Sequence, residues 1–116
     1  MLVSCVPGFY SGLERLFEII AKQIDETVPA GETWHKELLL QMTCEQPGIR
    51  PGVVSKDNAV LLDEFRRFRH LVRNVYTMNL VPEKIRRLIS ILPNLWPKVR
   101  AELTAFAEFS EDLGAV

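Results

Sequence analysis

The chain has 116 residues, of which 47% are hydrophobic and 25% are charged, and its formal net charge is −1. These values predict one folded domain over residues 1–116 and argue against a disordered chain. The near-zero net charge excludes a bulk electrostatic attraction to nucleic acid or to a membrane surface, so anion binding would need a local patch. No apolar run is long enough to cross a membrane, and the two cysteines cannot form a disulfide framework. We therefore expect a cytoplasmic protein with reduced thiols.

Helical periodicity recurs along the chain, whereas strand signals are nearly absent. The first predicted helix covers about 11–27, with Ser11 as its cap and an apolar stripe at three- and four-residue spacing. The sequence VPAGE ends it, and a second predicted helix covers about 32–44. A loop rich in proline and glycine follows. Ser55 is then predicted to cap a third helix that continues to about Met78. Its predicted inward seam is Leu61, Phe65, Phe68, Val72, Val75 and Asn79.

The last third of the chain predicts two further helical segments. Pro82 fits the first position of a fourth helix. Pro93 and Pro97 are expected to kink or break it, and a last helix then continues to about Asp112. Short loops between amphipathic helices predict an all-α fold, an antiparallel bundle of four to five helices.

The segment FRRFRHLVRNVYTMNL, residues 65–80, holds most of the functional candidates. Three guanidiniums and a phenol fall within roughly an 80° arc of an ideal helix: Arg66, Arg69, Arg73 and Tyr76. Guanidiniums bind phosphate oxygens through planar forks, so the segment predicts contacts with phosphate or RNA backbone. The predicted phosphate-binding residues are Arg66, Arg67 and Arg73. One alternative is an ordinary salt-bridged face, and another is a protein interface. The candidate acids for a salt-bridged face, on neighbouring helices, are Glu14, Glu18, Asp25, Glu32 and Glu37.

Other chemistries find little support in the sequence. Two histidines, His35 and His70, and two distant cysteines do not make a zinc site. A glycine-rich phosphate loop and a nucleophile elbow are both missing from the sequence. No metal and no cofactor are therefore predicted. His35 is expected to be a surface or half-buried hydrogen-bonding residue, with a share in an RNA site as the alternative.

Three blocks in chain order, TWHKELLLQMT, FRRFRHLVRNVYTMNL and LPNLWPKVRAEL, resemble the HepT-like ribonuclease toxins of the HEPN family. Within them, RHLVRNVY is similar to the family motif Arg-x4-His-x-Tyr. The resemblance implies a HEPN-like homodimer that cleaves RNA without a metal and is neutralised by a nucleotidyltransferase antitoxin. It also implies that Arg69 is the motif arginine and that Tyr76 is the motif tyrosine, which such an antitoxin can modify with adenylate groups.

The sequence departs from the family motif at Asn74, which stands where the motif has a histidine. Metal-independent cleavage needs groups that accept and donate protons near the phosphate, and an amide does not titrate. Cleavage is expected to be weak unless His70 supplies the missing acid–base group, and His35 is the next candidate for that role. The alternative is a catalytically degenerate HEPN domain that binds RNA or protein beside a nucleotidyltransferase. The predicted catalytic residues are Arg69, His70, Asn74 and Tyr76.

The spacing of the motif also favours a dimeric site. Arg69 and position 74 lie about 140° apart around an ideal helix, so one straight helix does not direct both at the same phosphate. Two copies related by a two-fold axis could bring them together, and symmetric dimers are the commonest oligomers. We therefore expect a homodimer that buries the face from Arg66 to Tyr76.

Overall fold

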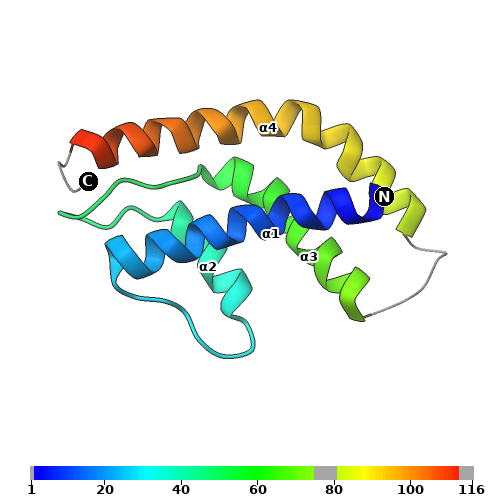
Figure 1. The fold of residues 1–116 in the computed structure, drawn as a ribbon, viewed down its shortest axis with the longest axis horizontal. Helices are drawn as coiled ribbons and strands as arrows, with labels where there is room; N and C mark the ends of the chain where they lie inside the picture. Colours follow the sequence, from blue (N-terminus) through cyan, green and yellow to red (C-terminus); the bar gives the residue numbers. More distant parts are fainter. Residues whose placement is uncertain (1, 75–80, 113–116) are drawn as a thin grey trace.

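The computed structural model describes the backbone of residues 2–74 and 81–112 and the side chains of residues 8–70 and 83–110. The described chain is an all-α bundle, as the sequence predicts (Figure 1). Its elements in chain order are α1 (Leu2–Ile20), the π-helical turn η1 (Ala21–Asp25), α2 (Trp34–Thr43), α3 (Lys56–Asn74) and α4 (Val81–Asp112).

The helices α1 and α3 each contact the other three α-helices, and they contact one another most extensively. In Figure 1 the long helices α1 and α4 both run from right to left, and α3 runs back against them. The short helix α2 packs against α1 and α3. None of the helices in the described part of the chain has the length and hydropathy that a membrane span requires.

The core is formed by apolar side chains from all four α-helices. Phe17 of α1, Leu38 of α2, Phe65 of α3 and Val99 of α4 are all fully buried. Each comes from a stripe with helical spacing, so the predicted inward faces are confirmed at these positions.

The first helix begins earlier than predicted. It starts at Leu2 rather than at Ser11, and it includes Pro7 and Gly8. Pro7 is the sixth residue of α1 and so lies beyond the first four N–H groups, which have no intrahelical partner; it removes one helical hydrogen bond, and the helix continues through it. The helical stretch ends after η1 at Glu26, whose φ of 57° is left-handed.

The helix α4 continues through both of its internal prolines. Pro93 and Pro97 lie inside it, so the separate last helix of the prediction is not formed. Both prolines are exposed and are four residues apart, which places them on one outer face. The carbonyl groups that lose their N–H partners on that face can bond to water, so the helix can bend without ending. Figure 1 shows α4 as one arched helix.

The start of α3 is fixed as the sequence predicts. Ser55 caps the helix, since the Asn58 N–H donates to Ser55 Oγ at 3.2 Å. The backbone N–H of Ser55 and the side-chain amide of Asn58 also donate to Glu102 of α4, at 2.9 and 2.8 Å. The predicted end of this helix at Met78 lies outside the described residues.

A buried ion pair, which the sequence analysis did not identify, joins η1 to the loop before α3. Arg50 Nε and Nη2 donate to the two carboxylate oxygens of Asp25, at 2.6 and 2.7 Å. The other donors of the guanidinium go to the backbone carbonyls of Gln41, Cys44 and Pro51. All five N–H donors of the guanidinium are therefore used, which suits a side chain with no exposed area.

Candidate polar site around Arg69

Arg69 lies inside the bundle rather than on an exposed stripe, and only 4% of the residue is exposed. Its Nη1 and Nη2 atoms lie 2.9 Å from Oε1 and Oε2 of Glu14 on α1. Its Nη1 atom also donates to Ser11 Oγ at 3.3 Å, and its Cζ lies 5.1 Å from the centre of the Tyr10 ring. The helix α1 therefore supplies an anion, a hydroxyl and an aromatic face to this one guanidinium.

His35, in the first turn of α2, completes what we call the Arg69 cluster: Glu14, His35 and Arg69. His35 Nδ1 lies 2.7 Å from Glu14 Oε2 and 3.1 Å from Arg69 Nη2. Arginine only donates and an ionised carboxylate only accepts, so Nδ1 can serve just one of them at a time. The shorter distance to Glu14 favours the tautomer in which Nδ1–H donates to the carboxylate. The ring of Trp34 lies against the imidazole, with 3.7 Å between the ring centres.

The electrostatics of the cluster follow from burial and from these hydrogen bonds. Burial alone would raise the pKa of Glu14, but the bonds and charges of Arg69 and His35 outweigh it and hold the pKa below its ordinary value. Glu14 is therefore ionised at neutral pH. Burial, reinforced by the Glu14 carboxylate, raises the pKa of Tyr10. Among the described side chains, the Tyr10 hydroxyl is the one buried nitrogen or oxygen atom without a partner.

Arg66 and Arg67 have a partner on their own helix. Arg66 Nε donates to Asp63 Oδ1 at 2.6 Å, and Arg67 Nε lies 3.2 Å from Asp63 Oδ2. The side chain of Arg67 is 63% exposed, and that of Arg66 is 18% exposed. The sequence analysis looked for acids on neighbouring helices, and found Glu14, but overlooked this carboxylate one turn earlier on the same helix.

The remaining predicted site residues are described less fully. His70 is an exposed residue of α3. Arg73 and Asn74 belong to α3, but their side chains lie outside the described ones, and Tyr76 lies outside the described residues. The arrangement of Asn74 and Tyr76 around Arg69 therefore stays a prediction.

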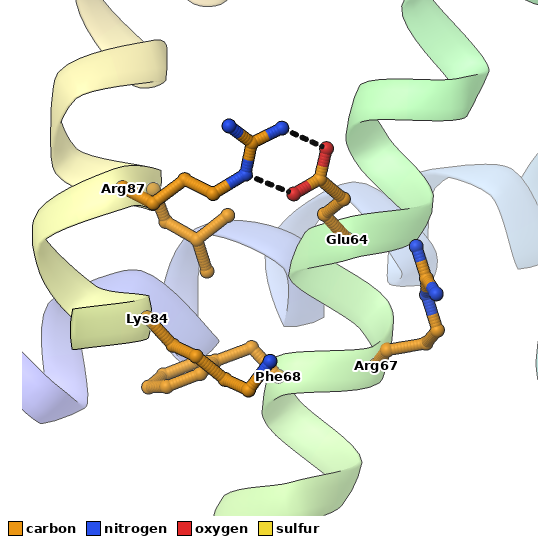
Figure 2. Close-up of a pocket in the computed structure, with 6 residues that line it drawn as sticks. Glu64, Arg67, Phe68, Lys84 and Arg87 are labelled. Carbon is orange, nitrogen blue, oxygen red and sulfur yellow. Dashed lines mark hydrogen bonds and ion pairs between the residues drawn. The ribbon is translucent and has the colours of Figure 1, made fainter. Parts of the chain in front are cut away.

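A groove of about 370 Å³ lies between α3 and α4 (Figure 2). Three cations, one carboxylate and two apolar side chains line it: Glu64, Arg67, Phe68, Lys84, Arg87 and Leu88. Figure 2 shows Arg87 reaching across to Glu64, where its Nε and Nη2 donate at 2.7 and 2.9 Å. These hydrogen bonds lower the pKa of Glu64. In the same view the Arg67 side chain extends on the side of α3 away from α4.

The groove therefore has a modest excess of positive charge. One of its three cations, Arg87, is paired with its single carboxylate, and Arg67 is paired with Asp63 on the far side of α3, so the positive charge inside the groove comes mainly from Lys84. The sequence analysis did not identify Lys84 and Arg87, because they come from α4, far from the arginine-rich segment in the chain. Their spacing of one helical turn was the available sign that they share a face.

The burial of Arg69 could have been found in the sequence. Asn58, Leu62, Phe65 and Arg69 follow one another at spacings of four, three and four, and all are buried. The seam predicted for α3 used Leu61, which is only half-buried. A charged residue at an inward position needs a buried partner, and this requirement points to an acid on a facing helix.

The structure thus defines a small all-α protein in which α3 buries an arginine against a carboxylate and an imidazole from two other helices. Within the described ranges no group of three or more histidines, cysteines and acids is placed to hold a metal ion. The chain matches the family model described as HepT-like protein over residues 1–110, and it belongs to this family. The resemblance seen in the sequence is therefore confirmed. Neither the comparison with curated proteins nor the comparison with solved structures gave a match.

Proposed function

We propose that the chain is a ribonuclease toxin that cleaves RNA without a metal ion. Its membership of the HepT-like family supports this function. The observation that carries the proposal is the Arg69 cluster, in which the motif arginine lies 3.1 Å from an imidazole and 2.9 Å from a carboxylate. Metal-independent cleavage makes the RNA 2′-hydroxyl attack its own phosphate, and it needs a group that moves protons together with cations near the phosphate.

RNA binding is assigned to cations near this cluster. Arg67 is the most exposed of the described arginines in the segment, and Arg66 lies beside it. Arg73 completes the set that the sequence predicts. Electrostatic contacts of this kind act on the phosphate backbone and carry no sequence information, so we expect binding to many RNAs.

The proposal includes the partners that the family suggests. A homodimer would bring two copies of α3 together, and a nucleotidyltransferase antitoxin would neutralise the toxin and could modify Tyr76. We expect the pair to act in the cytoplasm. Mass spectrometry of Tyr76 after incubation with the antitoxin and ATP tests the modification, and light scattering tests the dimer against the 13.3 kDa chain.

The second candidate function is a catalytically degenerate HEPN domain that binds RNA or protein without cleaving. Two observations favour it. Asn74 replaces the motif histidine, and both Nη atoms of Arg69 are already bonded to Glu14, which leaves this cation less available to a phosphate.

The decisive experiment incubates purified protein with a single-stranded RNA in the presence of EDTA. We expect cleavage that leaves a 2′,3′-cyclic phosphate, while a DNA of the same sequence stays intact because it lacks the 2′-hydroxyl. The Arg69→Lys variant, purified in the same way, controls for contaminating nuclease. A lysine cannot reproduce the two-point contact with Glu14, so this variant should be much less active.

The possible outcomes separate the two candidate functions. RNA that is bound but not cut supports the degenerate domain. RNA that is neither bound nor cut argues against both functions. Equal cleavage by the parent and by Arg69→Lys shows that the activity does not come from this site.

A further inference from the structure

We propose that His35 of α2 is the residue that takes the proton from the RNA 2′-hydroxyl, and that Glu14 and Arg69 position it. This inference rests on the proposed ribonuclease function and names the proton-transfer group of its site. It moves that group from the arginine-rich segment of α3 to a residue more than thirty positions earlier in the chain.

The first step of the argument is the orientation of the imidazole. Nδ1 faces the two buried members of the cluster, Glu14 at 2.7 Å and Arg69 at 3.1 Å. With its proton on Nδ1 and donated to Glu14, the neutral ring carries its free lone pair on Nε2. A carboxylate that fixes the imidazole tautomer in this way is the arrangement that makes histidine a general base in hydrolytic enzymes.

The second step is access. The His35 side chain is 32% exposed, whereas the Glu14 and Arg69 side chains are 6% and 5% exposed. Both hydrogen-bond contacts of the ring with described residues use Nδ1. The Nδ1 edge of the ring is held inside the bundle, so the exposed part of the side chain lies on the edge that carries Nε2. A substrate hydroxyl can approach the one nitrogen that is able to accept a proton.

The third step concerns the rigidity of the support. Glu14 is held at both oxygens by Arg69, so the carboxylate cannot turn away from His35. Trp34 lies against the ring and limits its movement. Positioning of this quality matters because general-base catalysis depends on hydrogen-bond geometry before it depends on proton affinity. Arg69 then acts as a positioning residue, and the phosphate contacts come from more exposed cations.

The fourth step compares His35 with the other groups available. The sequence has two histidines, and the motif position in α3 is the amide Asn74, which cannot accept a proton at neutral pH. His70 is the other imidazole, on the exposed face of α3. The structure places His35 against a buried carboxylate and against the motif arginine, Arg69, and these two contacts make it the candidate for the proton-transfer group.

The proposed step balances as follows. The 2′-hydroxyl proton moves to His35 Nε2 while the 2′-oxygen forms a bond to phosphorus. The bond from phosphorus to the 5′-oxygen breaks, and the leaving oxygen takes a proton from water. The products are a 2′,3′-cyclic phosphate and a free 5′-hydroxyl. The imidazolium then returns its proton to solvent.

The test compares His35→Asn with His70→Asn in single-turnover cleavage of an RNA oligonucleotide in EDTA. An asparagine amide can still donate to Glu14 from near the Nδ1 position, but it has no counterpart of Nε2. We expect His35→Asn to lower the cleavage rate by about 100-fold or more, the usual contribution of a general base, with RNA affinity unchanged. His70→Asn should have a much smaller effect on the rate.

Two variants that each replace one carboxylate test whether Glu14 positions His35. Glu14→Gln should lower the rate, because the amide no longer fixes the imidazole, and RNA affinity should again be unchanged. Glu32→Gln, which neutralises an exposed acid just before α2, is the matched control and should keep the parent rate. All variants are compared at a temperature at which circular dichroism shows them folded.

A measurement without RNA tests the inference independently of any cleavage activity. Nitrogen-15 NMR of the histidine rings should give His35 the tautomer with its proton on Nδ1 and a bare Nε2. The opposite tautomer overturns the inference. Equal rates of RNA cleavage by the parent and by His35→Asn also overturn the inference. This result would not contradict the ribonuclease function. A parent that does not cleave at all removes both proposals together.

Discussion

Arg69 and Glu14 meet edge to edge, with each Nη atom of the guanidinium 2.9 Å from one oxygen of the carboxylate. Both side chains are almost fully buried, so the pair joins α1 to α3 inside the bundle. A buried pair of this kind need not stabilise the fold more than apolar side chains would, but leaving one partner alone is costly.

Arg69→Met should destabilise the protein strongly, because it leaves the Glu14 carboxylate buried without its cation. We expect the free energy of unfolding to fall by about 3–5 kcal/mol, measured by urea denaturation at neutral pH. Arg67→Met is the matched control, since it removes an exposed arginine two residues earlier in the same helix, and it should change stability by about 0.5 kcal/mol or less. Equal losses in the two variants would contradict the burial of Arg69.

The stability of the parent should fall in acid, because the pKa values of Asp25 and Glu14 are lower in the folded protein than their ordinary values of 3.8 and 4.5. For Asp25, burial acts to raise the pKa, but the bonds from Arg50 and Gln41 outweigh it. A lowered carboxyl pKa contributes stability that is complete above the unfolded value and is lost as pH falls through the folded value. The urea concentration at the midpoint of unfolding should therefore fall as the pH is lowered from about 5 to the folded pKa values of these two carboxyl groups.

Asp25→Asn isolates the contribution of this one carboxylate to the acid dependence of stability. The variant should be less stable at neutral pH, and its urea midpoint should change less on acidification than that of the parent, because an amide does not titrate. Glu45→Gln is the control: it changes an exposed acid in the loop after α2, and its urea midpoint should depend on pH as that of the parent does. Identical acid dependence in parent and Asp25→Asn would show that the ion pair with Arg50 does not contribute.

Glu26→Gly should stabilise the protein. Glu26 ends the helical stretch with a φ of 57°, a left-handed conformation that costs a residue with a side chain roughly 1–2 kcal/mol. Glycine takes this conformation readily and is the usual residue there. We expect a gain of about 1 kcal/mol in thermal or urea unfolding. Glu18→Gly, inside α1, should instead lower stability by about 1 kcal/mol. A loss in both variants would argue against the left-handed turn.

The sequence predicted most of the fold but misplaced the most important side chain. Amphipathic spacing and the Ser55 cap were sufficient for the core positions and for the start of α3. The rule that proline breaks helices failed at Pro93 and Pro97, because both lie on an exposed face where the affected carbonyls can bond to water. Arg69 was assigned to an exposed stripe, since one helix in isolation does not show which face its neighbours cover.

The composition of the Arg69 cluster depended on tertiary contacts. Glu14, His35 and Arg69 come from three helices, and no spacing along the chain brings them together. Glu14 was considered as one of five candidate acids for the arginine segment, and only the packing of α1 on α3 selects it. The Asp25 and Arg50 pair was missed for the same reason, because it joins a π-helical turn to a loop.

Binding to RNA should depend on salt in proportion to the phosphates that the cations contact. Arg67→Ala removes an exposed guanidinium, and the slope of log affinity against log salt should fall by about 0.7 for a single-stranded RNA. Arg100→Ala, at an exposed cation on α4, is the control and should leave the slope unchanged. Fluorescence anisotropy at several salt concentrations measures both slopes. If both variants lose the same amount, binding is spread over the surface and has no defined face.

The last prediction concerns position 74, where the family motif has a histidine and this chain has Asn74. If His35 is the proton acceptor in this protein, an imidazole introduced at position 74 of α3 should accept the proton in part of the reaction events. Asn74→His should therefore raise the rate of RNA cleavage. It should also make His35→Asn less harmful, so that the rate loss from His35→Asn is smaller in the Asn74→His background than in the parent.

Such non-additivity is expected of groups that act on one reacting centre. The four cleavage rates of this double-mutant cycle, measured in EDTA with the same RNA, show whether positions 35 and 74 act on the same phosphate. Independent, multiplicative effects would mean that positions 35 and 74 do not serve the same phosphate. A lower rate for Asn74→His than for the parent would mean that the asparagine already has a role of its own, and that the departure from the family motif is not a loss of function.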